Sequence, residues 1–345
     1  MKNKNKKMKV DFNDIVIVPA KMSDIDSRKE IDILENGKLP LITAPMDTVI
    51  DISSAHIYSS CGFNVCLPRN FSTDRNLNQE FFQSFGLDEI IAMVNNELPL
   101  PKKVLIDIAH GGMRKLFNIS KTIKSKYPET LLMIGNIANP DTFKEYCSIG
   151  VDYVRIGIGG GSVCTTSANV GVHYPMVSLI EDCYIIKTEN CYKTKIVADG
   201  GFRRFEDIIK ALALGADLIM CGSILSKSFE SCSDFYRYEV LDKSYKKIDI
   251  DQAENFFNMG IDIYKYYRGM STKGVQKDWD KKDLTTSEGI TMYNKVEYKI
   301  DTWLENFSDY LKSAMSYCNS RDLKIFRSTT KLELITPAAY QRFHK

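Results

Sequence analysis

The residues best suited to chemistry lie in one short loop, Gly157–Thr166, which joins a glycine-rich stretch to a cysteine and two threonines. Glycines let backbone amide and carbonyl groups approach a ligand closely, because they carry no Cβ. The backbone N–H groups of such a loop, together with Ser162, can hold a phosphate, and its carbonyls can coordinate a cation. Cys164 is a candidate nucleophile, and the threonine hydroxyls beside it can relay protons. The loop therefore predicts an anion-binding turn that carries a nucleophile.

Eight short apolar segments must position this loop, and each predicts a parallel β-strand buried on both faces. They are Leu39–Met46, Phe63–Pro68, Phe81–Gly86, Val104–Ile108, Leu131–Asn136, Tyr153–Ile158, Lys195–Gly200 and Asp217–Ser223. Helix-compatible segments separate several of them: Gly112–Lys126, Asp141–Ser148 and Arg203–Leu214. Alternating strands and helices imply a parallel sheet. Eight such units predict a single-domain α/β fold, the (β/α)8 TIM barrel.

The polar residues that follow these strands would form one ring, because reacting groups in such a barrel lie at the carboxyl ends of the strands. They are Met46-Asp47, Arg69, Asp107, Asn136, the Gly157–Thr166 loop, Asp199-Gly200-Gly201 and Gly222-Ser223. Loops after the seventh and eighth strands frequently form the phosphate site of a barrel. Three glycine-containing loops at one end predict a bound phosphoester.

The composition excludes several classes of protein. The net charge of +2, from 46 basic and 44 acidic residues, gives no electrostatic preference for nucleic acid. No uninterrupted apolar run reaches roughly 18 residues, so we expect no membrane span. The nine cysteines include no C-x-x-C pair. This pattern argues against a zinc ribbon or a disulfide framework and favours a reducing, cytoplasmic location.

The remaining segments are assigned from composition and periodicity. We expect a disordered basic tail at 1–9, the barrel domain at 10–330 and a C-terminal tail at 331–345. Within the barrel domain we expect a loop or small insertion at 232–266, a flap-like loop at 271–288 and a helix outside the barrel at 299–318. The lysine-rich part of the flap-like loop, 273–282, is expected to be solvated and mobile.

Taken together, the motifs resemble those of the IMP dehydrogenase/GMP reductase family. The resemblance covers nearly the whole chain, from residues 10–19 to 327–330. Its motifs are Ala44-Pro-Met-Asp-Thr-Val49, Ile106-Asp-Ile-Ala-His-Gly111, Gly135-Asn136, the Gly-Ser-Val-Cys-Thr-Thr loop, Ala198-Asp-Gly-Gly201 and Tyr267-Arg-Gly-Met270. The cysteine loop and the Tyr-Arg-Gly-Met segment are highly specific when they occur in this order.

The resemblance implies a role for each matching residue. Cys164 would attack C2 of a purine nucleoside 5′-monophosphate to form a covalent thioimidate, with Thr166 and Glu288 handling protons. The implied substrate-binding residues are Ser162, Gly201, Gly222, Ser223 and Tyr267 at the phosphate, Asp199 at the ribose, Met270 and Ser271 at the base, and Gly200 and Gly269 beside them. The implied cofactor-side residues are Arg69, Asp107, Ala109 and Asn136. The carbonyls of Gly159, Gly161 and Cys164 match a monovalent-cation site, implying a possible K⁺.

The two branches of the family share the covalent step and differ in the fate of the thioimidate. The dehydrogenase converts IMP to XMP with NAD and activates water with a flap that carries an Arg-Tyr pair. The reductase converts GMP to IMP and ammonia with NADPH, using a threonine–glutamate pair. The segment Ser271–Ser287 contains no arginine, and its only aromatic residue is Trp279. Its short length and composition favour the reductase, whereas Pro68–Ser72 resembles the dehydrogenase branch.

Three functions are therefore open on the sequence alone: a GMP reductase, an IMP dehydrogenase without the regulatory insert, and a non-catalytic barrel that binds a purine nucleotide. Gly160 and Ser167 depart from the usual family pattern, which leaves a deoxynucleotide or modified purine open as substrate. The resemblance also suggests a homotetramer. Retention of Cys164, Thr166 and Glu288 together favours an enzyme.

Overall fold

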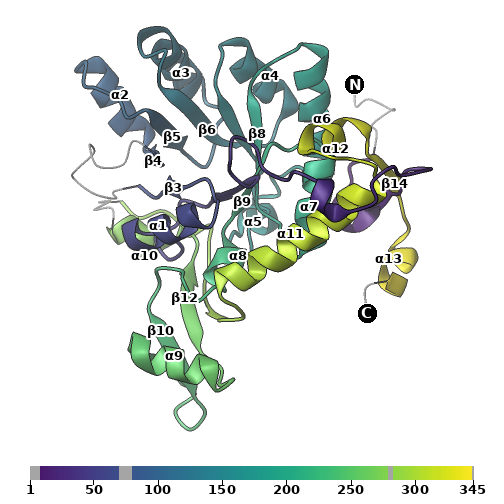
Figure 1. Ribbon diagram of the computed structural model, residues 1–345. Coiled ribbons are helices and arrows are strands. Elements are labelled where there is room, and N and C mark those ends of the chain that lie inside the picture. The colour runs from purple at the N-terminus through teal and green to yellow at the C-terminus, as the bar shows by residue number, and fades with distance from the viewer. Residues whose placement is uncertain (1–7, 70–79, 279–282, 344–345) are drawn as a thin grey trace.

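The computed structural model describes residues 8–69, 80–278 and 283–343 (Figure 1). The basic tail expected at 1–9 lies outside the described residues except for Met8 and Lys9. Lys9 is held against the barrel, because its Nζ forms an ion pair of 2.7 Å with Asp182.

The predicted (β/α)8 barrel is confirmed. Its parallel strands follow the order β2-β9-β8-β7-β6-β5-β4-β3. They are β2 (Leu41–Thr43), β3 (Cys66–Leu67), β4 (Phe82–Phe85), β5 (Lys103–Asp107), β6 (Leu131–Ile137), β7 (Tyr153–Ile156), β8 (Lys195–Asp199) and β9 (Leu218–Cys221). A parallel bridge between Ile42 and Asn64 joins the two ends of the sheet. Each of the eight apolar segments singled out in the sequence thus overlaps a strand of the barrel, and only β5 and β6 extend one residue beyond the predicted bounds.

Alternating side chains of the strands fill two separate cores, as the two-residue repeat of a strand requires. Leu105 points into the barrel, whereas its neighbours Val104 and Ile106 pack against the surrounding helices. The interior is filled by Ile42, Ala44, Cys66, Phe82, Leu105, Met133, Val197, Leu218 and Met220. The barrel is therefore a packed core, and its chemistry is confined to its ends.

Helices surround the strands, as Figure 1 shows. They are α1 (Ile52–Ser60), α2 (Leu87–Asn95), α3 (Arg114–Lys126), α4 (Pro140–Ser148), α6 (Met176–Glu189), α7 (Phe205–Ala213), α11 (Ile300–Tyr317) and α12 (Leu323–Thr329), with short helices α5 (Thr166–Val170) and α8 (Ser223–Ser226) at the mouth. The expected outer helix at 299–318 corresponds to α11. It packs through buried Trp303, Phe307 and Leu311.

The segment expected as a loop or insertion at 232–266 is folded. It forms β10 (Phe235–Glu239), β11 (Ser244–Ile248), α9 (Ile250–Asn258) and the start of β12 (Tyr264–Arg268). These strands and β13 (Thr291–Lys295) make an antiparallel sheet in the order β11-β10-β12-β13. We call the residues 232–266 and β13 the insertion sheet. It has its own small core of Phe235, Ala253, Ile263 and Val296, and it projects from the barrel in Figure 1.

Two other expectations differ from the structure. Residues 331–345 are not a plain tail, because β14 (Lys331–Leu334) pairs antiparallel with β1 (Ile15–Val18) and α13 (Pro337–Phe343) follows it. Within 273–282, residues Lys273–Asp278 form helix α10 instead of a solvated loop, with Val275 and Gln276 buried. Short 3₁₀ turns at Phe12–Asp14 and Arg28–Glu30 complete the described elements.

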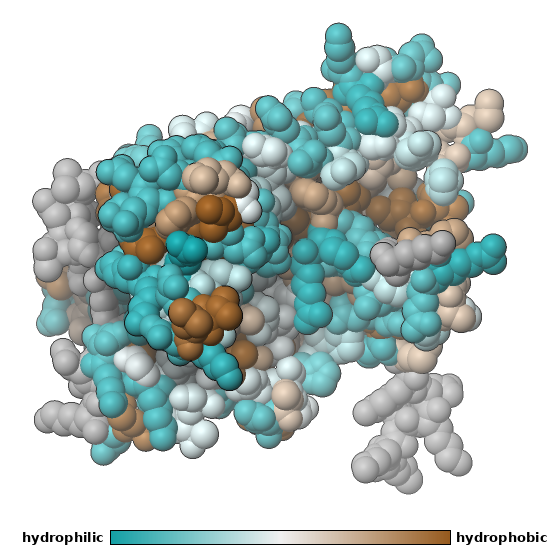
Figure 2. Space-filling model, turned by 90° about the horizontal axis from the view of Figure 1, so that it is seen from below, coloured by the Kyte–Doolittle hydropathy of each residue, from teal (hydrophilic) through white to brown (hydrophobic). Residues whose placement is uncertain are grey.

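The surface seen from below is mostly hydrophilic, and its hydrophobic side chains lie in separate patches (Figure 2). Within the ranges that the structure describes, no helix is long and apolar enough to cross a membrane.

Candidate active site at the carboxyl end of the barrel

A cavity of about 690 Å³ opens at the carboxyl ends of the strands. Every residue to which the family resemblance assigns a role lines it. These residues are Arg69, Asp107, Ala109, Asn136, Gly159, Gly161, Ser162, Cys164, Thr166, Asp199, Gly200, Gly201, Gly222, Ser223, Tyr267, Gly269, Met270, Ser271 and Glu288. Segments that lie far apart in the chain thus meet in one hollow, which only the closure of the barrel brings about.

A hydrogen-bonded relay connects the candidate nucleophile to a carboxylate. The Cys164 thiol donates to Thr166 Oγ1, with 3.4 Å between sulfur and oxygen. The Thr166 hydroxyl in turn donates to Glu288 Oε2 over 2.6 Å. Glu288 lies 122 residues after Thr166, so the fold and not local sequence creates this contact. The three groups can move a proton between sulfur and carboxylate through one hydroxyl.

Backbone pairing between two distant segments places Glu288 at the cysteine loop. The Thr165 N–H donates to the Glu288 carbonyl over 3.0 Å, and the Ile290 N–H donates to the Val163 carbonyl over 2.9 Å. Cys164 and Gly289 form an antiparallel bridge between these two bonds. The backbone of the cysteine loop and the backbone around Glu288 are therefore paired directly, which brings the two parts of the relay together.

Close backbone approach explains two glycines of the site. Gly157 has φ +121°, and a Cβ there would lie 2.3 Å from the Asp199 carbonyl oxygen. A Cβ on Gly269 would lie 2.8 Å from the Val163 carbonyl oxygen. A side chain at either position would push apart segments that carry site residues.

A largely buried charge network forms another part of the cavity wall. Arg155 on β7 donates through Nη1 to Asp107 over 2.7 Å and through Nε to Asp199 over 2.9 Å. The Asn136 amide donates to Asp199 over 2.6 Å and to the Gly157 carbonyl over 2.8 Å. Arg69 Nε lies 3.5 Å from Asp107. Burial lowers the pKa of Arg155, but Asp199 and Asp107 outweigh it, so that the pKa is raised overall.

These contacts hold the Asp199 carboxylate between a guanidinium and an amide, which fixes its orientation. The oxygens of a carboxylate at the mouth can accept hydrogen bonds from two hydroxyl groups of a ligand.

The Tyr267 side chain is buried at the third glycine-containing loop. Its hydroxyl donates to the Met46 sulfur over 3.6 Å. Burial raises the pKa of Tyr267, so the phenol keeps its proton and can donate to an anion. A Cβ on Gly222 would lie 3.2 Å from that hydroxyl. The phenol and the surrounding glycine backbone are suited to a phosphate.

Asp47, which belongs to the polar ring expected from the sequence, does not line the cavity. It forms ion pairs instead with Arg268, whose Nη2 lies 2.5 Å from Asp47 Oδ2 and 2.7 Å from Asp278 Oδ2. Asp278 ends α10, so Arg268 links that helix to the loop after β2. Asp47 is therefore a support for the mouth.

Reasoning from the sequence gave no role to several polar residues that line the cavity, and Arg155 and Gln276 are among them. A signal existed for Arg155, because it is a charged residue inside an apolar segment that predicts a buried strand. Gln276 carried no such signal, because α10 was expected to be a solvated loop.

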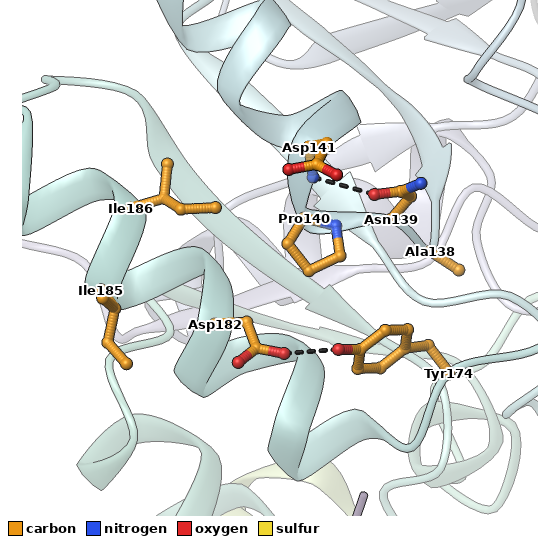
Figure 3. Close-up of a pocket in the computed structure, with 8 residues that line it drawn as sticks. All are labelled: Ala138, Asn139, Pro140, Asp141, Tyr174, Asp182, Ile185 and Ile186. Atoms are coloured by element: carbon orange, nitrogen blue, oxygen red, sulfur yellow. Dashed lines mark hydrogen bonds between the residues drawn. The ribbon is translucent and has the colours of Figure 1, made fainter. Parts of the chain in front are cut away.

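A second hollow, of about 480 Å³, lies between α4 and α6 (Figure 3). The Tyr174 hydroxyl donates to Asp182 there over 2.5 Å, and the Asn139 side chain caps α4 by accepting from the Asp141 N–H. None of the predicted site residues lines this hollow.

Among the described residues, no group of three or more His, Cys, Asp or Glu side chains is arranged to hold a metal ion. The carbonyls proposed for a monovalent cation are engaged but not saturated. The Gly159 oxygen accepts from Ser167 Oγ over 2.9 Å, and the Gly161 oxygen accepts from the Cys164 N–H over 3.0 Å. Each carbonyl oxygen keeps a second lone pair.

Comparison with known proteins identifies the family. A family model described as the IMP dehydrogenase / GMP reductase domain matches residues 100–345, which include most of the cavity. The chain belongs to the IMP dehydrogenase/GMP reductase family. The family has two branches, IMP dehydrogenases and GMP reductases.

The relatives include both branches. The chain is 32% identical over 255 residues to an inosine-5′-monophosphate dehydrogenase of Chlorobaculum tepidum, an alignment that covers 70% of this chain and 47% of the relative. It is 27% identical over 344 residues to GMP reductase 1 of Mus musculus, covering 92% of each, and 26% identical over 349 residues to GMP reductase 2 of Bos taurus, covering 94% and 93%. The chain spans about half the length of the dehydrogenase but nearly all of each reductase.

Proposed function

We propose that the protein is a GMP reductase, which converts GMP to IMP and ammonia with NADPH. The observation that carries this proposal is the hydrogen-bonded relay from Cys164 through Thr166 to Glu288 inside the cavity. Two further observations support it. The reductases match over nearly their full length. The segment Ser271–Ser287 holds no arginine that could activate water.

The first chemical step forms a carbon–sulfur bond and releases the amino group. The Cys164 sulfur attacks C2 of guanine, and the thiol proton passes to Thr166 and Glu288. The relay then returns a proton to the amino group of C2, which leaves as ammonia. The product of this step is a thioimidate in which C2 is bonded to the Cys164 sulfur.

The second step replaces the sulfur by hydrogen. NADPH supplies a hydride when it is bound. The carbon–sulfur bond breaks, its electron pair returns to the Cys164 sulfur, and IMP is released. Because a thiolate is a good leaving group, cysteine suits both halves of the reaction. The cavity wall of Arg69, Asp107, Ala109 and Asn136 is where we place the nicotinamide side, next to but separate from the relay.

The nucleotide is held by the loops after β7, β8 and β9. We assign the phosphate to Ser162, Gly201, Gly222, Ser223 and Tyr267, with Gly200 adjoining. The Tyr267 phenol and the backbone amides of these loops donate to it. Asp199 accepts from the ribose hydroxyls, and Met270 and Ser271, which follow Gly269, contact the base. This order along the cavity would place C2 near Cys164.

The proposal extends to the cofactor, the cation, the assembly and the location. NADPH is favoured over NAD because the reductase is. A K⁺ ion could use the second lone pairs of Gly159 and Gly161 together with the Cys164 carbonyl. A homotetramer follows from the family resemblance. A reducing cytoplasm is supported by the described cysteines, which are all free thiols.

An IMP dehydrogenase is the second candidate. The observation that favours it is the higher identity, 32%, to the Chlorobaculum tepidum dehydrogenase over 255 residues. It would use the same cavity and the same Cys164 thioimidate, formed from IMP. Hydrolysis of that thioimidate would then need a group to activate water.

The deciding experiment follows NADPH absorbance when the purified protein is mixed with GMP, and NADH formation when it is mixed with IMP and NAD. We expect NADPH oxidation with release of ammonia. Reduction of NAD with IMP, and no NADPH oxidation with GMP, would establish the dehydrogenase instead. Nucleotide binding by calorimetry without turnover in either assay would favour a non-catalytic binding barrel. A Glu288→Gln variant should lower turnover by about 10²–10⁴-fold, the usual contribution of general acid–base catalysis.

A further inference from the structure

Gln276 is a buried polar residue of the cavity to which the proposed function assigns no role. It lies on α10, is 4% exposed and lines the cavity between Ser271 and Glu288. A buried primary amide is costly unless its hydrogen-bonding groups are satisfied. Its partners therefore show which segments it holds.

The Gln276 amide uses its full hydrogen-bonding capacity on two backbone segments. Its oxygen accepts from the Thr285 N–H over 2.8 Å and from the Thr285 hydroxyl over 3.2 Å. Its nitrogen donates to the Thr285 carbonyl over 3.3 Å and to the Ser271 carbonyl over 3.5 Å. Two donors and two acceptor lone pairs are all that a glutamine side chain has. The amide thus pairs with Thr285 as a strand backbone would.

These bonds connect Ser271, at the start of the flap-like loop, to Thr285, close to Glu288 at its end. Thr285 lies three residues before Glu288, and the Ser271 carbonyl that accepts from Gln276 also accepts from the Glu288 N–H over 3.4 Å. One turn earlier, the Lys273 N–H donates to Ser287 Oγ over 3.0 Å. Gln276 is the side chain that closes this segment from inside the cavity.

We propose that Gln276 is a positioning residue that holds Glu288 in hydrogen-bonding reach of Thr166. The proposal rests on the proposed function, in which Glu288 moves the proton of the leaving amino group. Gln276 does not touch the relay itself. It keeps Ser271 and Thr285 at a constant separation, so that the Glu288 carboxylate has one position. A fully satisfied buried network is the kind that specifies a single arrangement.

The test compares four variants with the wild type: Gln276→Met, Glu288→Gln, the double variant, and Lys277→Met. Methionine has nearly the size of glutamine but no amide. Lys277 is the exposed neighbour of Gln276 on the same helix, so Lys277→Met is the matched control. We expect Gln276→Met to lower kcat by about 10- to 100-fold, the effect of a small misplacement of a reacting group. The KM for GMP should change less than about threefold, since phosphate and ribose bind to other loops.

The double variant separates positioning from general support. If Gln276 acts through Glu288, the double variant should lose no more kcat than Glu288→Gln alone, within about threefold. Losses that multiply would overturn the proposal, and so would wild-type kcat in Gln276→Met. If Gln276→Met does not fold, Gln276→Glu takes its place, because it keeps the size and the acceptors and loses the two donors.

A measurement without turnover keeps the proposal testable if the proposed function fails. Alkylation of Cys164 by iodoacetamide, followed by peptide mass spectrometry, reports on the relay directly. Gln276→Met should change the alkylation rate of Cys164 in the same direction as Glu288→Gln, and Lys277→Met should leave it unchanged. A rate for Gln276→Met that matches the Lys277→Met control would overturn the positioning role. A wild type inactive on GMP would instead overturn only the reductase.

Discussion

The mouth of the barrel and the insertion sheet each bury a cationic side chain, and they stabilise it in opposite ways. Arg155 at the mouth is 11% exposed and lies between two carboxylates, Asp107 and Asp199, each 17% exposed. Burial lowers the pKa of Arg155, yet the two carboxylates outweigh burial and raise it. The guanidinium is thus compensated by charge on both sides, and because it bridges the two carboxylates it also fixes their positions.

Lys265 in the insertion sheet has no such counter-charge. It is 1% exposed, donates to the Ser231 carbonyl, and its Nζ lies 4.0 Å from the centre of the Phe235 ring. It forms no ion pair within the part of the chain that the structure describes. Burial lowers its pKa to about 8, although Cys232 and Glu230 act in the other direction. A carbonyl dipole and an aromatic face compensate only part of the cost of burying an ammonium group.

The two cations differ in what their charge does for the protein. At the mouth, a permanent cation orients Asp199, which we assign to the ribose. In the insertion sheet, the Lys265 cation is buried against a carbonyl and an aromatic ring. We therefore expect that removing the charge of Arg155 lowers the stability of the protein, whereas removing the charge of Lys265 raises it.

The largest predicted effect is on turnover, and it should leave the stability that the charge network provides unchanged. Cys164→Ala should lower turnover by about 10⁴-fold or more, because no other group can form the thioimidate. The Arg155 network does not include the thiol, so the midpoint of thermal unfolding should stay within about 2 °C of wild type. NADPH oxidation and calorimetric unfolding measure the two quantities. Nucleotide binding should persist, and turnover near the wild-type rate would rule out the covalent mechanism.

Arg155→Met should produce the largest loss of stability. It leaves Asp107 and Asp199 buried without their shared counter-charge, and breaking a buried pair in this way costs about 3–5 kcal/mol. Urea denaturation measures this as a lower midpoint at an unchanged slope. Arg155→Lys is the matched control, since it keeps the charge but not the two-sided geometry. A loss below about 1 kcal/mol for the methionine variant would mean that the carboxylates are solvated and that the contrast with Lys265 is wrong.

Lys265→Met should have a smaller effect of opposite sign, and one that depends on pH. The lysine binds a proton in the unfolded chain up to the ordinary lysine pKa of 10.5, but in the folded protein only up to a pKa of about 8. Between these values the unfolded state binds more protons, so the stability of the wild type rises with pH. Its penalty is fully present below pH 8 and is relieved as the pH approaches 10.5.

The methionine variant has no such titration. Relative to the variant, the wild type should therefore gain about 2 kcal/mol between about pH 7.5 and about pH 9.5. Urea midpoints of both proteins at these two pH values measure the gain. The same pH change applied to Lys246→Met, an exposed lysine of β11, is the control. A difference between wild type and Lys265→Met that does not vary with pH would show that Lys265 is compensated as well as Arg155.

The barrel and the insertion sheet also differ in how far they could be predicted from the sequence. The eight strands were predictable, because buried parallel strands read as continuous apolar segments with polar residues at their ends. The residues of the cavity followed, since barrel topology brings those ends together. The relay partner Glu288 came from the family resemblance, because nothing local links it to Thr166.

The insertion sheet could not be predicted in the same way. Its strands alternate tyrosine with charged residues, as in Tyr236-Arg237-Tyr238, and such a pattern looks like a solvated loop when no neighbouring strand is known. Helix α10 was missed because only Val275 and Gln276 face inward, too few for a helical period to show. The hydrogen-bond partners of Gln276 lie nine and five residues away in the sequence, and no residue pattern indicates such contacts.

The smallest predicted effect tests whether the insertion sheet rests on aromatic contacts rather than on charge. Tyr245 on β11 and Tyr293 on β13 stack with ring centres 3.9 Å apart and an angle of 13° between the ring planes. Their strands are not neighbours, because β10 and β12 lie between β11 and β13 in the sheet. Such a pair contributes about 0.5–1.5 kcal/mol beyond its buried area. A double-mutant cycle of Tyr245→Ala and Tyr293→Ala should give a coupling energy in this range in urea denaturation.

The control cycle pairs Tyr238→Ala with Tyr293→Ala, two residues without a mutual ring contact among the described residues, and it should show coupling below about 0.5 kcal/mol. NADPH oxidation should stay at the wild-type rate in the Tyr245 variant, because this residue lies outside the cavity lining. Equal coupling in both cycles would mean that the tyrosines act as one general apolar surface. Coupling confined to the stacked pair would show that the insertion sheet, unlike the barrel mouth, is held together by neutral contacts and tolerates its uncompensated lysine for that reason.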